Sequence, residues 1–325
     1  MISFQGISKT FKVAKREPGL SAALKSVFKR EYTYVEALKN VSFHIERGEI
    51  IGYIGPNGAG KSTTIKILSG ILVPTSGTCT ILGQVPWNNR IDHVKNIGVV
   101  FGQRSQLMWD IPVLDSYELL RDIYRVPETK YRKNLEELIE IFNLADFINT
   151  PVRQLSLGQR MRCEIAASLL HSPQILFLDE PTIGLDAVSK VAVRNFVKRI
   201  NKENGVTVVL TTHDMGDVEA LTDRVMLIGK GEILYNGSFD HIKSKYNTIN
   251  ILTIGYDENQ EIILPEHTTL ISNENGRAVL SVDTKKTPVS EVIGRLTQTS
   301  TVYDIAVQAR PIEEVIAEIY KEFSI

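Results

Sequence analysis

Between residues 60 and 245, short apolar runs alternate with helical patterns of apolar and polar positions. The most apolar runs are IGVVF at 97–101, QILFLD at 174–179 and VTVVLTT at 206–212. They carry almost no polar side chains before their carboxyl ends, which is typical of strands buried on both faces of a parallel sheet. The pattern therefore predicts an α/β fold in which ligands bind where these strands end.

The beginning of the chain has a different pattern. ISFQGISKTF and ALKNVSFHIERGEIIGYIG predict an antiparallel β subdomain, and the second run ends in a glycine-rich turn. Between them, residues 13–31 predict a helical insertion with an apolar face and with Lys25 and Lys29 on the opposite face. Such a helix fits an anionic membrane interface, although a solvated helix packed on the protein explains the pattern equally well.

The pattern changes again near residue 245. INILTIGY and RAVLSV predict short strands, and VSEVIGRL and PIEEVIAEIYKEF predict amphipathic helices. The apolar stripe of the last helix contains Ile312, Val315, Ile316, Ile319 and Phe323. We expect residues 1–245 to form the main domain, with a helical subdomain at about 104–170, and residues 246–325 to form a small α+β domain.

Composition limits the possible functions. The formal net charge of −1 argues against a generally basic, nucleic-acid-binding surface. Cys79 and Cys163 are far apart, which argues against a disulfide framework or a zinc site. The N-terminal residues lack the pattern of a signal peptide, and no apolar run approaches the ~18 residues of a membrane span. We therefore expect any membrane-crossing part to belong to another chain.

GPNGAGKST at 55–63 matches the phosphate-loop pattern G-x-x-x-x-G-K-[ST]. Its glycines let successive backbone N–H groups turn towards one anion, and a helix that begins near Lys61 adds its positive end. Lys61 is suited to the β- and γ-phosphates, and the Ser62 hydroxyl to Mg²⁺. The predicted cofactors are ATP and Mg²⁺, and the predicted phosphate site contains Gly55, Pro56, Asn57, Gly58, Ala59, Gly60, Lys61, Ser62 and Thr63.

Asp179 and Glu180 stand at the end of the apolar run ILFLD. Carboxylates beside a buried strand require compensation, which Mg²⁺ would give to Asp179, while Glu180 would activate the attacking water. The alternative is that both are solvated acids at a strand end. Gln103 and His213 also follow apolar strands. Gln103 is the candidate contact to Mg²⁺ and the water, and His213 to the γ-phosphate, unless they are structural residues.

LSLGQR at 155–160 predicts a second anion site. Ser156 can cap the helix that follows, with Gln159 three residues later in a capping-box arrangement. The remaining N–H groups of the first turn and the helix dipole then favour an anion. Because the phosphate loop already holds one nucleotide, this second site is expected to serve a nucleotide bound elsewhere.

The chain resembles the nucleotide-binding subunit of ABC transporters. The resemblance is carried by five elements in this order: GPNGAGKST, Gln103, LSLGQR, ILFLDEPTIGLD and His213. The resemblance implies that two cassettes pair head to tail, so that Ser156, Gly158 and Gln159 of one chain close on ATP held by the other. It also implies that Asp186 couples the two sites. Leu157 stands where the family usually has Gly, and IGLD replaces the more common SALD.

The same resemblance implies an aromatic side chain that stacks on adenine from the strand before the phosphate loop. Counting back from the phosphate loop by this resemblance gives Tyr32, with Tyr34 as the close alternative. Either residue would otherwise be a half-buried strand tyrosine.

Among ABC proteins, the chain resembles the ATPases of bacterial drug- and antibiotic-type or polymer exporters. This implies an integral membrane permease and a second cassette, identical or different, as partners at the cytoplasmic face of the membrane. The alternative is an ABC ATPase that acts on ribosomes or DNA; the single cassette and near-neutral charge favour transport. Leu107, Met108 and Trp109 are the predicted apolar surface that receives the permease, unless they pack between subdomains.

Overall fold

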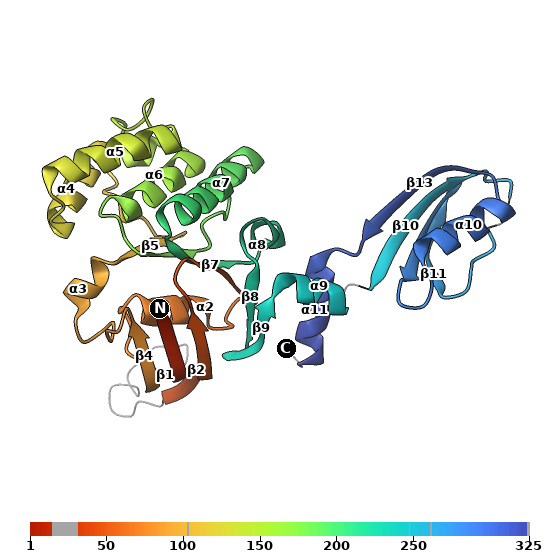
Figure 1. Cartoon of the computed structure of the whole chain (residues 1–325), viewed down its shortest axis with the longest axis horizontal. Helices are drawn as coiled ribbons and strands as arrows, with labels where there is room; N and C mark the ends of the chain where they lie inside the picture. The colour runs from red at the N-terminus through yellow and green to blue at the C-terminus, as the bar shows by residue number, and fades with distance from the viewer. Residues whose placement is uncertain (15–31, 103, 247, 261, 324–325) are drawn as a thin grey trace, which may run out of the picture. The chain divides into compact units, whose positions relative to one another are not determined.

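The computed structural model describes residues 1–14, 32–102, 104–246, 248–260 and 262–323. The chain divides into two units, Met1–Gly237 and Ser238–Ile325, and Figure 1 shows the elements of each. The predicted insertion at 13–31 and Gln103 fall almost entirely outside the described residues.

A six-stranded sheet forms the centre of the first unit, in the order β5-β6-β7-β3-β8-β9. Its strands are β3 (Ile50–Ile54), β5 (Ile97–Phe101), β6 (Ile175–Asp179), β7 (Thr207–Thr212), β8 (Arg224–Gly229) and β9 (Glu232–Ser238). The pairs β5–β6, β6–β7, β3–β7 and β3–β8 are parallel. The three apolar runs thus form three adjacent strands, and every residue of β6 and β7 is buried, as the lack of alternation predicts.

A three-stranded antiparallel sheet, in the order β2-β1-β4, packs on the same unit. It contains β1 (Ile2–Ala14), β2 (Tyr32–Ile45) and β4 (Ser76–Ile81). Helix α2 (Lys61–Leu68) lies beside it (Figure 1). One buried cluster joins the two sheets through α2, with Phe4 and Phe43 stacked at 4.6 Å and Tyr53 against them.

Helix α3 (Arg90–Val94) lies beside the end of α2, where His93 Nε2 is 2.8 Å from the Leu68 carbonyl oxygen. Other helices cover the other side of the unit. They are α4 (Val113–Tyr124), α5 (Glu128–Phe142), the 3₁₀ helix η1 (Val152–Gln154), α6 (Leu157–Leu169), α7 (Ala187–Asn204) and α8 (Met215–Leu221). Their shared core includes Tyr117 of α4, Phe142 of α5 and Ile165 of α6. Phe142 also meets Phe196 of α7 with ring centroids 4.0 Å apart, which joins the helical part to the sheet layer.

The second unit contains a four-stranded antiparallel sheet in the order β11-β12-β10-β13. Its elements are α9 (Phe239–Tyr246), β10 (Ile249–Tyr256), β11 (Thr268–Glu274), β12 (Arg277–Asp283), α10 (Val289–Thr299), β13 (Val302–Ala309) and α11 (Ile312–Glu322). Leu252 and Leu280 of the sheet pack against Val292 and Leu296 of α10, which gives this unit its own core.

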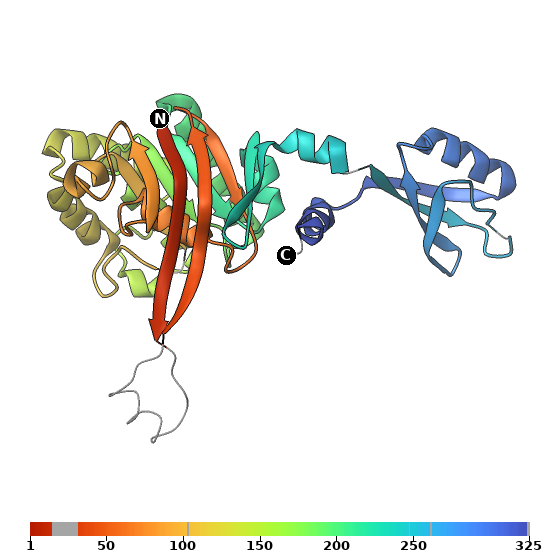
Figure 2. The ribbon, with the colours of Figure 1, turned by 90° about the horizontal axis from the view of Figure 1, so that it is seen from below.

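The units divide ahead of α9, whereas the sequence pattern predicts a boundary after residue 245. Figures 1 and 2 both show α9 beside α11. Phe239 and Ile242 of α9 are buried, as are Val315, Ile316 and Ile319 of α11, and this non-local packing explains the earlier boundary. Phe323 is exposed rather than part of the buried stripe, because α11 ends at Glu322.

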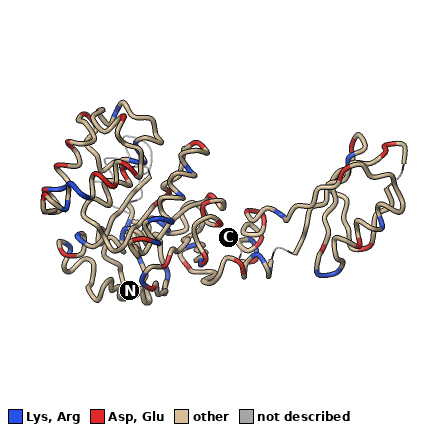
Figure 3. The backbone as a smooth tube through the Cα atoms, turned by 45° about the horizontal axis from the view of Figure 1, so that its top comes forward, with Lys and Arg blue, Asp and Glu red and all other residues tan. Residues whose placement is uncertain are grey.

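Acidic and basic residues are interspersed within each unit (Figure 3). Among the described residues, no helix has the length and apolar character needed to cross a bilayer.

Candidate functional site

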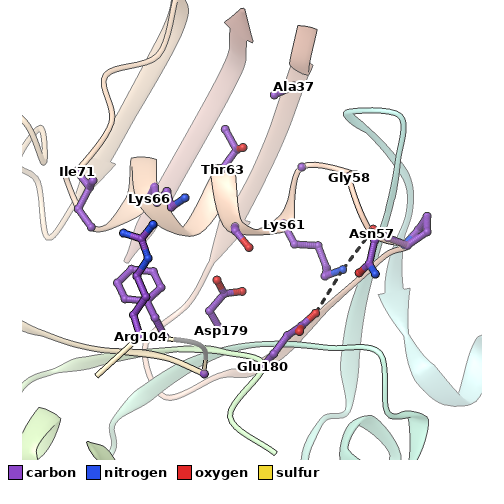
Figure 4. A pocket seen from close by; sticks show the side chains of 15 residues that line it. Ala37, Asn57, Gly58, Lys61, Thr63, Lys66, Ile71, Arg104, Asp179 and Glu180 are labelled. Carbon is purple, nitrogen blue, oxygen red and sulfur yellow. Dashed lines mark hydrogen bonds and ion pairs between the residues drawn. The ribbon is translucent and has the colours of Figure 1, made fainter. Parts of the chain in front are cut away.

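A cavity of about 420 Å³ opens at the carboxyl ends of the parallel strands, between the phosphate loop and the acidic end of β6 (Figure 4). Parallel strands present their carboxyl ends at one edge, so the loops that follow them converge there. Its lining residues are Ala37, Pro56, Asn57, Gly58, Gly60, Lys61, Ser62, Thr63, Lys66, Ile71, Phe101, Gly102, Arg104, Asp179 and Glu180.

The phosphate loop connects β3 to α2, and its backbone approaches other segments too closely for side chains. A Cβ atom on Gly60 would lie 2.7 Å from the Ala37 carbonyl oxygen, and one on Gly55 would lie 2.5 Å from the Ile228 carbonyl oxygen. Gly60 also has φ of 114°, a left-handed value that favours glycine. Gly55 and the buried Ala59 do not line the cavity. They shape the loop and leave its other residues to face the ligand.

Lys61 is the first residue of α2 and is buried. Its Nζ donates to the carbonyl oxygens of Gly55 at 2.6 Å and Pro56 at 3.3 Å. Burial lowers the pKa of Lys61, and the negative charges of Glu180 and Asp179 oppose that shift. Figure 4 shows the ammonium group directed towards Glu180, whose Oε1 lies 3.8 Å away. The Lys61 ammonium is thus held between the phosphate loop and Glu180, at the wall of the cavity.

Asp179 ends β6 and is buried beside the cavity, where its Oδ1 accepts a 2.6 Å hydrogen bond from the Thr211 hydroxyl. Glu180 follows with φ of 55°, a strained value for a residue with a side chain. Its backbone N–H donates to the Thr211 carbonyl at 3.0 Å. A Cβ on Gly102 would lie 2.4 Å from the Glu180 carbonyl oxygen. Neighbouring backbone therefore fixes the backbone of Glu180, from which the carboxylate extends towards Lys61.

His213 follows β7 and is exposed, with Nδ1 3.6 Å from Glu180 Oε1. It does not line the cavity, but it approaches the acid that does. Asp217, which the sequence patterns do not single out, binds to the loop after β6 and to the end of β7. Its fully buried carboxylate accepts from Arg194 Nε at 2.6 Å, from the Thr182 hydroxyl, and from the Thr212 hydroxyl at 3.4 Å.

Thr182 lies two residues after Glu180, and Thr212 directly precedes His213. Asp217 therefore holds the acid and the histidine loops in one network. In the sequence, Asp217 is an acid within the helical pattern that follows His213, and nothing distinguishes it there from other polar helix residues.

The predicted capping box at the start of α6 is confirmed. Ser156 Oγ accepts from the Gln159 N–H at 3.2 Å, and Gln159 Oε1 accepts from the Ser156 N–H at 2.9 Å. Asp186 caps α7 in turn, accepting from the Ser189 N–H at 2.8 Å, and its hydrogen bonds lower the pKa of that carboxyl. A Cβ on Gly158 would lie 2.6 Å from Ser189 Oγ, so the first turns of α6 and α7 touch.

Ser156, Gly158, Gln159 and Asp186 do not line the phosphate-loop cavity. They form a separate cluster, called here the α6–α7 cluster, in which two helix N-termini meet. Two adjacent N-termini favour an anion. The predicted phosphate-loop residues and the predicted LSLGQR residues thus lie in two separate places within one unit.

Tyr32 and Tyr34 also lie outside the cavity lining. Ala37 of the same strand does line the cavity. Tyr32 lies five positions before Ala37, which is about 17 Å along the strand at roughly 3.3 Å per residue. Tyr32 pairs instead with Ala14 at the far end of β1, with Lys12 Nζ 3.9 Å from its ring centroid. Strand pairing, which counting along the sequence ignores, decides which residues reach the cavity, so stacking by Tyr32 or Tyr34 stays a prediction that the cavity lining does not support.

The register places another aromatic residue, Phe11, nearer to Ala37 than Tyr32 is, and Phe11 also lies outside the cavity lining. Phe11 pairs with Val35, two positions from Ala37. Lys9 Nζ lies 5.3 Å from the Phe11 ring centroid. The same Nζ donates to the carbonyl oxygen of Val73 at 2.8 Å, and Val73 lies in the segment that follows α2. Phe11 therefore shares the β1 face that is turned towards α2 and its loop.

Known proteins are similar to this chain in sequence and fold. The profile of the ABC transporter family matches residues 38–183. The linearmycin resistance ATP-binding protein LnrL of Bacillus subtilis is 34% identical over 70% of this chain and 73% of its own length. The methionine import ATP-binding protein MetN of Geobacillus kaustophilus is 36% identical, over 64% of this chain and 62% of its own length.

Among solved structures, the dimeric post-hydrolysis state of the ATP-binding cassette MJ0796, bound to ADP and Pi, matches with a TM-score of 0.61 and 29% identity. The match covers 73% of this chain and 98% of that chain. Together with the identity to LnrL over most of both lengths, it settles the family. This chain belongs to the ATP-binding subunits of ABC transporters, and its activity is ATP hydrolysis.

Proposed function

We propose that the chain drives export through a separate membrane permease, and that ATP binding closes two cassettes head to tail at the cytoplasmic face of the membrane. The observation that carries the proposal is the separation of two anion-binding clusters in one unit. The phosphate-loop cavity contains Lys61 and Glu180, whereas the α6–α7 cluster does not line that cavity. Two chains arranged head to tail would join the two clusters.

The cavity fits a magnesium nucleotide. The phosphate loop and Lys61 would hold the β- and γ-phosphates, because both offer donors to an anion. Mg²⁺ prefers oxygen ligands, which the Asp179 carboxylate and the Ser62 hydroxyl supply at the cavity wall. Gln103, the third predicted ligand, is not among the described residues. Bound Mg²⁺ would neutralise charge on the phosphates.

Glu180 is the proposed base. Glu180 lines the cavity and its backbone is held by neighbouring segments, so its carboxylate can orient water for attack on the γ-phosphate. His213 lies 3.6 Å from the same carboxylate and is exposed, which suits a contact to the γ-phosphate once a second cassette covers the site. The chemistry would then depend on closure.

In the closed pair, the α6–α7 cluster of one chain would contact the γ-phosphate held by the other. The capping box occupies the N–H groups of Ser156 and Gln159, and the Ser156 hydroxyl keeps a proton to donate. The backbone N–H groups of Leu157 and Gly158, which lie between Ser156 and Gln159 in the sequence, are at the positive end of α6. Asp186 lies on the same surface, which suits its proposed coupling role.

A permease would dock near the start of the helical part. Met108 and Trp109 are 50% and 51% exposed and form the proposed contact. Leu107, predicted to share this surface, is buried in the helical core instead, because its N–H and carbonyl both bond Ser105 Oγ and turn the side chain inward. The contact surface is therefore smaller than the sequence indicates.

Export is proposed over import because the chain resembles the linearmycin resistance protein over 73% of that protein. A deletion strain should become more sensitive to toxic compounds that the transporter removes. A nutrient requirement in that strain, relieved by the intact gene, would indicate import instead.

The permease itself can be identified by purification. A tagged full-length Glu180→Gln chain, isolated with MgATP from detergent-solubilised membranes of its own organism, should retain an integral membrane protein. The wild-type chain without nucleotide is the matched control. Recovery of ribosomes or DNA in place of a membrane protein would support the alternative, a non-transport ABC ATPase.

Adenine recognition gives a separate prediction. Phe11→Leu is expected to weaken ATP binding about fivefold, because stacking on an aromatic ring contributes roughly 0.5–1.5 kcal/mol beyond area burial. Tyr32→Leu, the matched control, should change the affinity less than about twofold, because its position lies farther along the strand. Equilibrium binding of ATP to the full-length chain measures both. A larger loss for Tyr32→Leu than for Phe11→Leu would restore the tyrosine as the stacking residue.

A further inference from the structure

Ion pairs join α7 to α8. Lys190 and Arg194 lie four positions apart on α7, so they share one face of that helix. Across from them, Asp214 caps α8 and Asp217 lies in its first turn. Lys190 Nζ lies 2.5 Å from Asp214 Oδ2, and Arg194 Nε lies 2.6 Å from Asp217 Oδ1. Arg194 Nη2 also lies 3.6 Å from Asp214 Oδ1, so this guanidinium contacts both acids.

The pair formed by Arg194 and Asp217 is largely shielded from water. The Asp217 side chain is fully buried, and the Arg194 side chain is 22% exposed. Another pair on α7, Arg199 with Glu203, has side chains that are 49% and 60% exposed. Water and salt screen an exposed pair, whereas charges in a buried pair attract strongly. Removal of Arg194 alone would therefore leave the Asp217 carboxylate buried without this cation.

The two oxygens of the Asp217 carboxylate bind different parts of the fold. Oδ1 accepts from Arg194 Nε of α7. Oδ2 accepts from the hydroxyl groups of Thr182, in the loop after β6, and Thr212, at the end of β7. The Asp214 N–H donates to Thr212 Oγ1 at 3.0 Å. Because the carboxylate is a rigid planar group, the contact that holds Oδ1 on α7 also sets the position of both threonine hydroxyls.

The two threonines lie next to the residues proposed for hydrolysis. Thr182 is two residues from Glu180, and Thr212 directly precedes His213. Glu180 Oε1 and His213 Nδ1 are 3.6 Å apart. Arg194 does not line the nucleotide cavity, so its effect on the reaction has to pass through this network.

Helix α7 extends from this network to the α6–α7 cluster. Asp186, Lys190 and Arg194 follow each other at four-residue spacing, which places them along one side of the helix. Eight residues of α-helix span about 12 Å at roughly 1.5 Å per residue, with no loop between. Arg194 therefore fixes the loops of Glu180 and His213 relative to the cluster that meets the neighbouring chain's ATP in the proposed dimer.

We propose that Arg194 is a positioning residue for ATP hydrolysis. Its guanidinium holds Asp217 on α7, and Asp217 holds the loops that carry Glu180 and His213 in the places that attack on the γ-phosphate requires. The inference rests on the proposed function, in which Glu180 is the base.

The test compares variants of the full-length chain. Arg194→Met removes the cation and retains a long side chain that favours helix. Because this change leaves a buried charge, a double variant combines it with Asp217→Asn, which removes both charges and still offers an oxygen to the threonine hydroxyls. Arg199→Met is the matched control, because it removes an exposed ion pair from the same helix.

Arg194→Met is expected to lower kcat at least about tenfold, because misplacement of catalytic groups by about 1 Å can cost on the order of a hundredfold. ATP affinity should stay close to that of wild type, since the network does not line the cavity. The double variant should recover the melting temperature of Arg199→Met and keep the low kcat, because α7 stays untied from the loops. Steady-state hydrolysis, equilibrium titration with ATP and thermal unfolding measure these quantities.

A double variant that regains kcat together with its melting temperature would show a role in folding alone and overturn the proposal. So would an Arg194→Met chain whose kcat equals that of Arg199→Met. If Arg194→Met does not fold, the double variant decides by the same comparison. Retention of hydrolysis in Glu180→Gln would contradict the proposed function, whereas its loss there, with normal hydrolysis in Arg194→Met, contradicts this inference alone.

Discussion

Glu180→Gln is expected to lower ATP hydrolysis at least about a hundredfold, since a positioned general base contributes roughly 10²–10⁴-fold to rate. Gln keeps the size of Glu but cannot accept a proton from water. Glu180 is the carboxylate that both Lys61 and His213 approach, at 3.8 and 3.6 Å. Steady-state hydrolysis with saturating MgATP measures the effect.

The same variant should accumulate as an ATP-loaded dimer, because closure precedes the chemical step in the proposed cycle. Light scattering of the full-length protein with MgATP reports the oligomeric state. Glu203→Gln is the matched control, because Glu203 is an exposed α7 residue that pairs with Arg199. A Glu180→Gln chain that stays monomeric with saturating MgATP, with and without its membrane partner, would contradict the cycle.

Lys61→Ala is expected to weaken ATP binding at least about tenfold, since hydrogen bonds to charged groups contribute roughly 1.5–3 kcal/mol. The buried ammonium is already oriented by the Gly55 and Pro56 carbonyls, so it loses little freedom when it meets a phosphate. Equilibrium titration with ATP measures the loss. Lys198→Ala, at an exposed position of α7, should bind ATP normally. Equal affinity in both variants would exclude Lys61 from the phosphate site.

Local patterns predict much of the fold and of the site. The buried strands β5, β6 and β7, the start of α2 at Lys61 and the capping box of α6 all follow from residues close together in the sequence. In each case the controlling interaction spans only a few residues, as between Ser156 and Gln159.

Features set by contacts between distant segments are not predictable in this way. Phe11 comes near the cavity-lining Ala37 along the sheet only through its pairing with Val35 on another strand. Asp217 gains its role from Thr182, far earlier in the sequence. The boundary before α9 depends on packing with α11, about 70 residues later. Each needs the three-dimensional arrangement, because no local pattern distinguishes these residues from ordinary strand or helix positions.

The left-handed backbone at Glu180 has a practical consequence for protein engineering. A non-glycine residue at φ of 55° costs on the order of 1–3 kcal/mol, which glycine would largely recover. Selection of a variant library for heat resistance alone would therefore enrich replacements at position 180 that abolish turnover. Any thermostability screen on this protein should be paired with an activity screen, since the two criteria disagree at this residue.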